Sequence, residues 1–73
     1  MEDYRIGEIK QQYLAGTQVQ LIYMEGELQM KKGLKGIVQK VDDIEQIHVK
    51  WENGSTLAIN LKRDIVAVLK AGL

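Results

Sequence analysis

The chain has 73 residues, no cysteine and a formal net charge of zero, with ten basic and ten acidic side chains. A chain of this length forms one small domain, and it buries only about 60% of the surface that the unfolded chain exposes. Tight packing or oligomerisation must therefore supply further burial. The balanced charge argues against a dedicated nucleic-acid binder, whose affinity depends on clustered Lys and Arg. Without cysteine there is no disulfide and no thiolate metal site, and one histidine cannot hold zinc alone.

No apolar run approaches the length of a membrane-spanning helix. The chain begins with an acidic rather than a basic stretch, and no apolar segment follows it, which is unlike a signal peptide. We therefore expect a cytoplasmic protein that does not enter a membrane. The hydrophobic content of 45% predicts a folded chain rather than a disordered one.

Residues 2–14 are predicted to form an amphipathic helix. Ile6, Ile9 and Tyr13 recur at spacings of three and four, and polar residues occupy the other side. Gly16 provides a stop signal. Because an isolated helix of this length is marginal in water, its apolar stripe must dock either on its own sheet or on another copy of the chain.

Residues 17–69 are predicted to form a β unit. In its first strand, 17–24, the alternation places Val19, Leu21 and Tyr23 on one face. Further strands are predicted at 37–41, 45–52, 56–61 and 65–69. A long loop, 25–35, separates the first two strands, and a loop of this length in so small a domain is often functional.

The third strand alternates most clearly, with Ile47, Val49 and Trp51 in one phase. This inward phase predicts that Trp51 is a core anchor; the alternative is an exposed platform for a polyproline peptide. Asn53 and Gly54 follow, and they predict a type I′ hairpin turn because both tolerate positive φ. The short strands, the long early loop and the tight later turns predict a mainly β fold. We expect a small five-stranded SH3-like barrel with an N-terminal helix, in one domain covering residues 1–73.

Three stretches of the chain resemble an uncharacterised family of small bacterial proteins. They are Ala15-Gly16-Thr17-x-Val19-x-Leu21, then Gly33-x-Lys35-Gly36-x-Val38-x-x-Val41-Asp42-Asp43, and Ile47-His48-Val49-x-Trp51-x-Asn53-Gly54-Ser55-x-Leu57-Ala58. The family is a domain of unknown function, met in phages and other mobile elements as well as in bacterial chromosomes. The resemblance covers roughly residues 13–69. It implies an SH3-like fold and a phage or mobile-element setting, and it carries over no catalytic residue.

No group of residues predicts catalysis. His48 falls on the outward phase of its strand and is expected to be a surface residue, since acid–base or nucleophilic work needs an orienting partner beside it. A carboxylate from another subunit is the remaining alternative. Asp42, Asp43 and Glu45 lack the ligand spacing of a calcium loop and predict a solvated turn. We therefore expect no enzymatic activity, no cofactor and no metal.

A surplus of apolar residues near the 25–35 loop predicts a binding surface. These residues are Ile22, Met24, Leu28 and Met30. Methionine is common at adaptable binding surfaces, and an exposed apolar patch usually marks an interface. The alternative is that the N-terminal helix covers them. The leading hypothesis is a non-catalytic binding module that docks a protein partner, or a copy of itself, through this loop and patch.

The second hypothesis is an oligomeric protein that sequesters an anionic small molecule, such as a nucleotide signal. Its positive charges would be Lys31, Lys32, Lys35 and Arg63. Gly33 and Gly36 would add a backbone nest for the anion, although they also suit a bend in the sheet. Nucleic-acid binding is the least favoured hypothesis, because net charge is neutral and aromatic residues are few.

Overall fold

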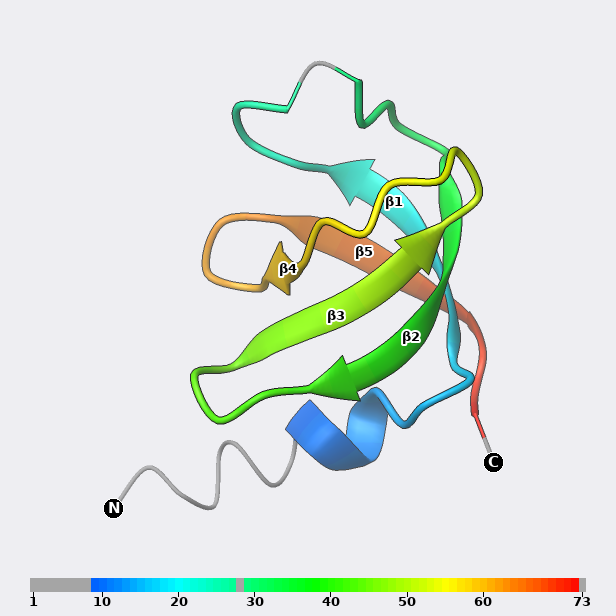
Figure 1. The fold of residues 1–73 in the computed structure, drawn as a ribbon, viewed down its shortest axis with the longest axis vertical. Helices are drawn as coiled ribbons and strands as arrows, with labels where there is room; N and C mark the ends of the chain where they lie inside the picture. Colours follow the sequence, from blue (N-terminus) through cyan, green and yellow to red (C-terminus); the bar gives the residue numbers. More distant parts are fainter. Residues whose placement is uncertain (1–8, 28, 73) are drawn as a thin grey trace.

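The computed structural model describes residues 9–27 and 29–72. Its strands form a single antiparallel sheet with the order β4-β3-β2-β1-β5 (Figure 1). The strands are β1 (Gln18–Tyr23), β2 (Lys35–Val41), β3 (Gln46–Trp51), β4 (Ile59–Asn60) and β5 (Ile65–Lys70). The prediction of a mainly β fold with five strands is confirmed.

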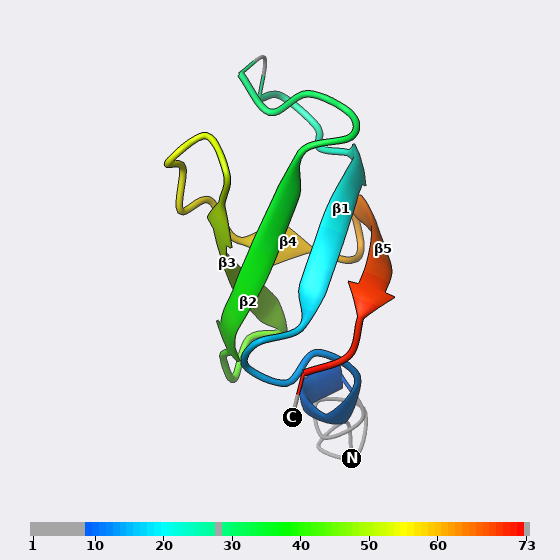
Figure 2. The ribbon, with the colours of Figure 1, turned by 90° about the vertical axis from the view of Figure 1, so that its right-hand side faces the viewer.

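The sheet is strongly curved but open. Figure 2 shows β4 crossing behind β2 and β1, while β5 forms the border of the sheet. Strands β4 and β5 are the two ends of the sheet, and no pairing joins them in the described part of the chain. The closed SH3-like barrel is therefore not confirmed. The predicted fourth strand, 56–61, is reduced to Ile59 and Asn60, which is too short to run along β5.

The inner face of the curved sheet holds the hydrophobic core. Its buried members are Val19, Leu21, Met24, Met30, Val38, Ile47, Val49, Trp51 and Ile59. Trp51 is a core anchor, as predicted, and its indole N–H donates to the Leu57 carbonyl over 2.9 Å. That bond holds residue 57 away from the β3 ladder, which explains part of the shortening of β4.

The predicted alternation fails at the end of β1. The pairing of β1 with β5 shifts register between Leu21 and Tyr23, which leaves Ile22 as an extra residue. Such a bulge moves the following side chains to the opposite face. Tyr23, predicted to share a face with Val19 and Leu21, is exposed whereas those two are buried, and Met24 is buried in its place.

Only the end of the predicted 2–14 helix can be compared with the structure, because residues 2–8 lie outside the described residues. Residues 9–12 are helical, and the Tyr13 N–H donates to the Ile9 carbonyl over 3.0 Å. Ile9 and Tyr13 pack against the core, and burial raises the pKa of the Tyr13 phenol. The described part of the helix therefore docks on its own sheet.

The hairpin between β3 and β4 is present, but its predicted type I′ turn is wrong. Gly54 has a φ of 89°, whereas Asn53 is not among the residues with positive φ. The Trp51 carbonyl accepts from the Gly54 N–H over 2.9 Å, and the Trp51 N–H donates to the Ser55 carbonyl over 2.9 Å. This pattern is that of a three-residue loop closed by a left-handed glycine bulge.

Candidate functional site

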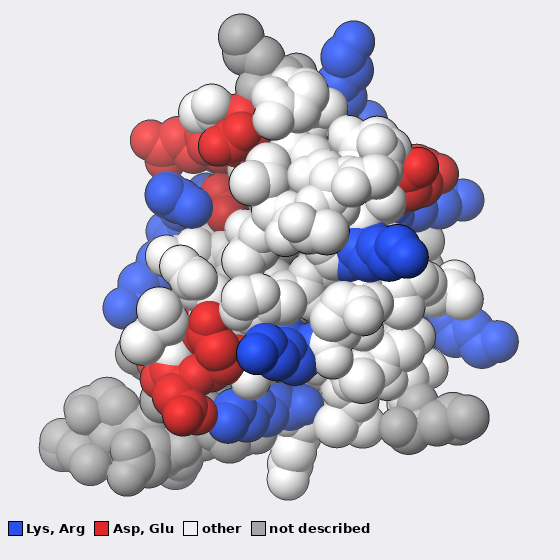
Figure 3. Space-filling model, viewed as in Figure 1, with Lys and Arg blue, Asp and Glu red and all other residues white. Residues whose placement is uncertain are grey.

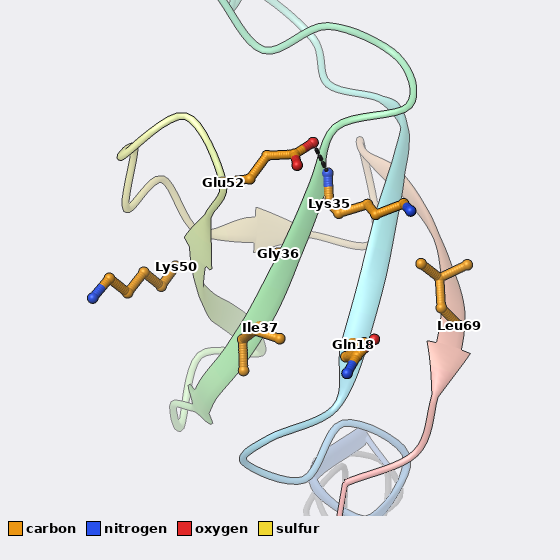
Figure 4. Close-up of a pocket in the computed structure, with 7 residues that line it drawn as sticks. All are labelled: Gln18, Lys35, Gly36, Ile37, Lys50, Glu52 and Leu69. Carbon is orange, nitrogen blue, oxygen red and sulfur yellow. Dashed lines mark hydrogen bonds between the residues drawn. The ribbon is translucent and has the colours of Figure 1, made fainter.

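The outer face of the sheet carries a shallow cleft of about 160 Å³. Figure 4 shows Ile37 on β2 and Leu69 on β5 at its sides, with Gln18 of β1 between the two strands. Ile37 is 39% exposed and Leu69 is 46% exposed, so both apolar side chains are half in water. We call this feature the outer-face cleft.

The sequence produces this cleft through the alternation of inward and outward side chains along β2 and β5. Ile37 points outward because Gly36 and Val38 occupy the inward phase of β2. Gly36 must lack a side chain, since a Cβ there would lie 2.5 Å from Val49 Cγ1 and 2.7 Å from Trp51 Cε3. On β5, Val68 lies opposite the inward-facing Val19, so the next residue, Leu69, turns its side chain to the outer face and into the cleft.

Charged residues Lys35, Lys50 and Glu52 border the cleft. The Glu52 carboxylate accepts from the backbone N–H of Lys35 over 2.9 Å, and the Glu52 N–H donates to the Lys35 carbonyl over 2.9 Å. Glu52 is thus committed to holding the start of β2 (Figure 4). Neither lysine ammonium has an ion-pair partner among residues 9–27 and 29–72. Figure 4 shows the Lys35 side chain running across β1 toward Leu69, whereas that of Lys50 extends away from the cleft. The cleft therefore combines apolar walls with one available positive charge, that of Lys35.

The apolar patch predicted from the sequence is not assembled. Met24 is 8% exposed and Met30 is 5% exposed, so the expectation that they lie on the surface is wrong. Both belong to the core, because a sheet this small has few other residues to fill its open end. Leu28 lies outside the described residues. Ile22 is exposed as expected, but it does not line the cleft.

A buried carboxylate that the sequence did not single out anchors the 25–35 loop. Asp64 accepts from the Asn60 N–H over 2.9 Å and from the Glu25 N–H over 3.2 Å. It also lies 3.6 Å from the Arg63 Nε. Asp64 therefore joins the turn between β4 and β5 to the start of the loop. No local pattern reveals this role, because Glu25 is distant in sequence.

The cations of the anion-sequestering hypothesis are not gathered around one pocket. Arg63 lies beside Asp64 in the turn between β4 and β5, whereas Lys35 opens β2 on another side of the molecule (Figures 1 and 2). Of Lys31, Lys32, Lys35 and Arg63, only Lys35 lines the outer-face cleft. The Gly33 N–H donates to the Leu21 carbonyl over 2.7 Å, so it is not turned toward an anion.

His48 forms a pair with Asp42, over 2.8 Å between Nε2 and Oδ2. The Asp42 carboxylate also accepts from the N–H groups of Gln46 and Ile44, over 2.9 and 3.0 Å. The Gln46 N–H first, and the His48 side chain second, lower the pKa of Asp42 below its ordinary value of 3.8. The sequence analysis missed Asp42 as the partner of His48. The signal available was the hairpin itself, which brings residues 42 and 48 close together across the turn between β2 and β3. The pair holds the turn together.

The face of the molecule seen in Figure 3 carries no single-sign charge field. Acidic and basic side chains are interspersed around a largely uncharged centre. Across the described residues, no group of three or more His, Asp or Glu side chains is placed to hold a metal ion. No helix in that part of the chain has the length and apolar character needed to cross a membrane.

Comparison with known proteins identifies a family. The chain matches the family described as Domain of unknown function (DUF4314) over residues 2–69. No curated protein and no solved structure matches it. The expected relationship to an uncharacterised domain family is thereby confirmed, while the SH3-like fold and the phage or mobile-element setting stay predictions.

Proposed function

We propose, from the premise that the chain belongs to the family of domains of unknown function DUF4314, that it is a non-catalytic module that binds a segment of a protein partner. One observation carries this proposal. The outer-face cleft presents two half-exposed apolar side chains, Ile37 and Leu69, beside Lys35, which has no ion-pair partner among the described residues. Exposed apolar surface rimmed by polar groups is typical of a protein interaction site.

The size and charge of the cleft indicate what the segment carries. Sites for drug-sized ligands usually enclose about 300 Å³ or more. The outer-face cleft, at about 160 Å³, suits one aliphatic side chain instead. Lys35 beside it favours an acidic residue next to that side chain. The expected ligand is therefore an extended segment in which an aliphatic residue neighbours Asp or Glu.

The other hypotheses have less support. Sequestration of a nucleotide would need several cations around one pocket, and Arg63 lies away from Lys35. Nucleic-acid binding by stacking needs several exposed aromatic side chains, and among the described residues Trp51 is buried and Tyr23 alone is exposed. The SH3-like relationship, the phage or mobile-element setting and the cytoplasmic location remain part of our proposal. The long first loop and the tight later turns support the first of these.

Selection from a random peptide display library tests the proposal. We expect enrichment of peptides that place Leu, Ile or Met next to Asp or Glu. Backbone amide shifts of Ile37 and Leu69 should change when a selected peptide is added. Ile37→Glu should abolish binding, because it removes an apolar wall and places a negative charge beside the ligand's acid.

Ile44→Glu is the matched control, since Ile44 is an exposed apolar residue in the turn between β2 and β3. This variant should bind the selected peptides with unchanged affinity. Equal binding by wild type and Ile37→Glu, or no enrichment of aliphatic and acidic residues, would contradict the proposal.

A further inference from the structure

The two ends of the sheet are protected to different degrees. An edge strand offers unpaired N–H and C=O groups to any other strand, and proteins usually protect it with shortness, proline, bulges or charges. Strand β4 has two residues and is protected by its shortness. Strand β5 has six residues, Ile-Val-Ala-Val-Leu-Lys, with no proline or glycine, and its one charge and the bulge at Leu69 both lie at its C-terminal end. Among the described strands β5 pairs with β1 alone.

Apolar side chains are also exposed along β5. Ile65 is 55% exposed and Val68 is 47% exposed, and Leu69 is similarly open to water. Figure 2 shows β5 at the border of the sheet with no described strand beyond it. The edge is therefore both unpaired and apolar, which is the combination that favours strand addition.

The backbone hydrogen bonds show which groups face the open edge. The Leu21 N–H donates to the Leu34 carbonyl and the Leu21 carbonyl accepts from the Gly33 N–H, so both groups turn away from β5. Because the direction alternates along a strand, Gln20 turns both of its groups toward β5, where it lies opposite Ala67. The neighbours of Ala67 in β5, Val66 and Val68, consequently turn their N–H and C=O groups to the open edge.

An antiparallel second copy of β5 fits this pattern. With Ala67 on a two-fold axis, Val66 lies opposite Val68 of the second copy, and each such pair can exchange both backbone hydrogen bonds. In the same register Ile65 lies opposite Leu69 of the second copy. Every position from 65 to 69 then meets an apolar residue that points to the same face of the sheet.

Charge favours the antiparallel arrangement as well. Lys70 is the single charged residue of β5 and stands at its C-terminal end. A parallel copy would place the two Lys70 ammonium groups side by side, and like charges directly opposite each other are destabilising. The antiparallel copy places them at opposite ends of the strand pair.

We propose that the protein self-associates into a two-fold symmetric dimer by antiparallel pairing of β5 with β5 about Ala67. The sheet then runs continuously through both copies. A single strand pair buries less than the interface of an obligate dimer, so a reversible monomer–dimer equilibrium is the expected behaviour. The dimer and the proposed peptide site share Leu69, whereas Ile37 of β2 belongs to the outer-face cleft alone.

Sedimentation equilibrium over a range of protein concentrations tests the dimer. Val68→Pro removes one N–H from the open edge, where proline is tolerated. It should weaken dimerisation by about tenfold or more, equivalent to ~1.4 kcal/mol, while circular dichroism and Trp51 fluorescence stay native. Ile37→Glu should dimerise like the wild type, because Ile37 lines the outer-face cleft but takes no part in β5 pairing; dimerisation and peptide binding can therefore fail separately.

A second variant keeps the test decisive if Val68→Pro does not fold. Ile65→Lys changes an exposed side chain and should also weaken dimerisation, because it sets a charge opposite Leu69 of the second copy. A wild-type protein that stays monomeric at all concentrations would overturn the proposal. So would a folded Val68→Pro or Ile65→Lys variant that dimerises as strongly as the wild type.

Discussion

Two hairpin loops of this protein share one backbone pattern and stabilise it differently. In the 51–55 loop, Trp51 bonds to Gly54 and Ser55, and the left-handed residue is Gly54. In the 42–46 loop, the Asp42 N–H donates to the Gln46 carbonyl over 3.0 Å, and the Glu45 N–H donates to the Asp42 carbonyl over 3.3 Å. Here the left-handed residue is Glu45, with a φ of 65°.

The difference lies in the residue that opens each loop. Trp51 ties the 51–55 loop to the core, and glycine then adopts positive φ at little cost. Asp42 opens the other loop with a carboxylate that accepts from Ile44 and Gln46 and contacts His48. These polar contacts offset the strain of a non-glycine residue in the left-handed region. One loop is therefore held by packing and the other by a side chain that titrates.

Truncation of Trp51, which packs the 51–55 loop against the core, should have the largest effect on the free energy of unfolding. Trp51→Ala should lower the free energy of unfolding by about 3–5 kcal/mol, because it empties the centre of the core. Urea unfolding followed by circular dichroism measures the change. Trp51→Phe keeps much of the ring volume and loses the bond to the Leu57 carbonyl, so its loss should be smaller. Equal losses for the two variants would contradict the role of packing.

Substitution of Gly54, the residue with positive φ in the 51–55 loop, should have the next largest effect on the free energy of unfolding. Gly54→Ala should cost about 1–2 kcal/mol, since an L-residue is strained at positive φ. A Cβ at Gly54 would meet no atom within 4 Å, so the cost is one of backbone conformation alone. Gly54→Asn is the control and should cost less, because asparagine tolerates this conformation. Thermal unfolding of the three proteins checks the order.

The sequence predicted those parts of the molecule that depend on local periodicity. Val19 and Leu21, like Val49 and Trp51, alternate at period two and are buried as expected. The burial of Met24 could not be predicted, because it follows from a register shift that depends on the pairing of β1 with β5.

The candidate site could not be predicted from the sequence, because it too depends on how the strands pair. Gly36 lacks a side chain because Trp51 stands opposite it across the β2–β3 ladder, and that pairing is not visible in local sequence. The outer-face cleft depends on Leu69 lying across β1 from Ile37, and that arrangement follows from the strand order, which local sequence does not show. Local composition around Ile37 and Leu69 resembles that of any half-buried strand.

Relief of the strain in the 42–46 loop should give a small gain. Glu45→Gly should raise the free energy of unfolding by about 0.5 kcal/mol, the strain removed being partly offset by the backbone entropy of glycine. Glu45→Ala keeps a Cβ at the same φ and should change stability less. Chemical denaturation of Glu45→Gly, Glu45→Ala and the wild type measures the two changes in the free energy of unfolding. A destabilising Glu45→Gly would show that the glutamate side chain matters more than its φ.

The smallest change in stability should be its dependence on pH. Of the two loops, only the 42–46 loop should make stability depend on pH. The pKa of Asp42 is lowered in the folded protein by its bonds to Gln46 and His48. A lowered folded-state pKa means that the ionised carboxylate stabilises the fold at pH values above the unfolded pKa, near 3.8. This stabilisation is lost as the pH falls through the folded-state pKa.

Asp42→Asn keeps a side-chain oxygen for the Ile44 and Gln46 N–H groups but does not titrate. The wild type should therefore be more stable than Asp42→Asn at neutral pH, and the gap in urea midpoints should close in strong acid. A gap that stays constant from neutral pH to strong acid would show that the carboxylate charge does not hold this loop, and the contrast with the 51–55 loop would then rest on Trp51 alone.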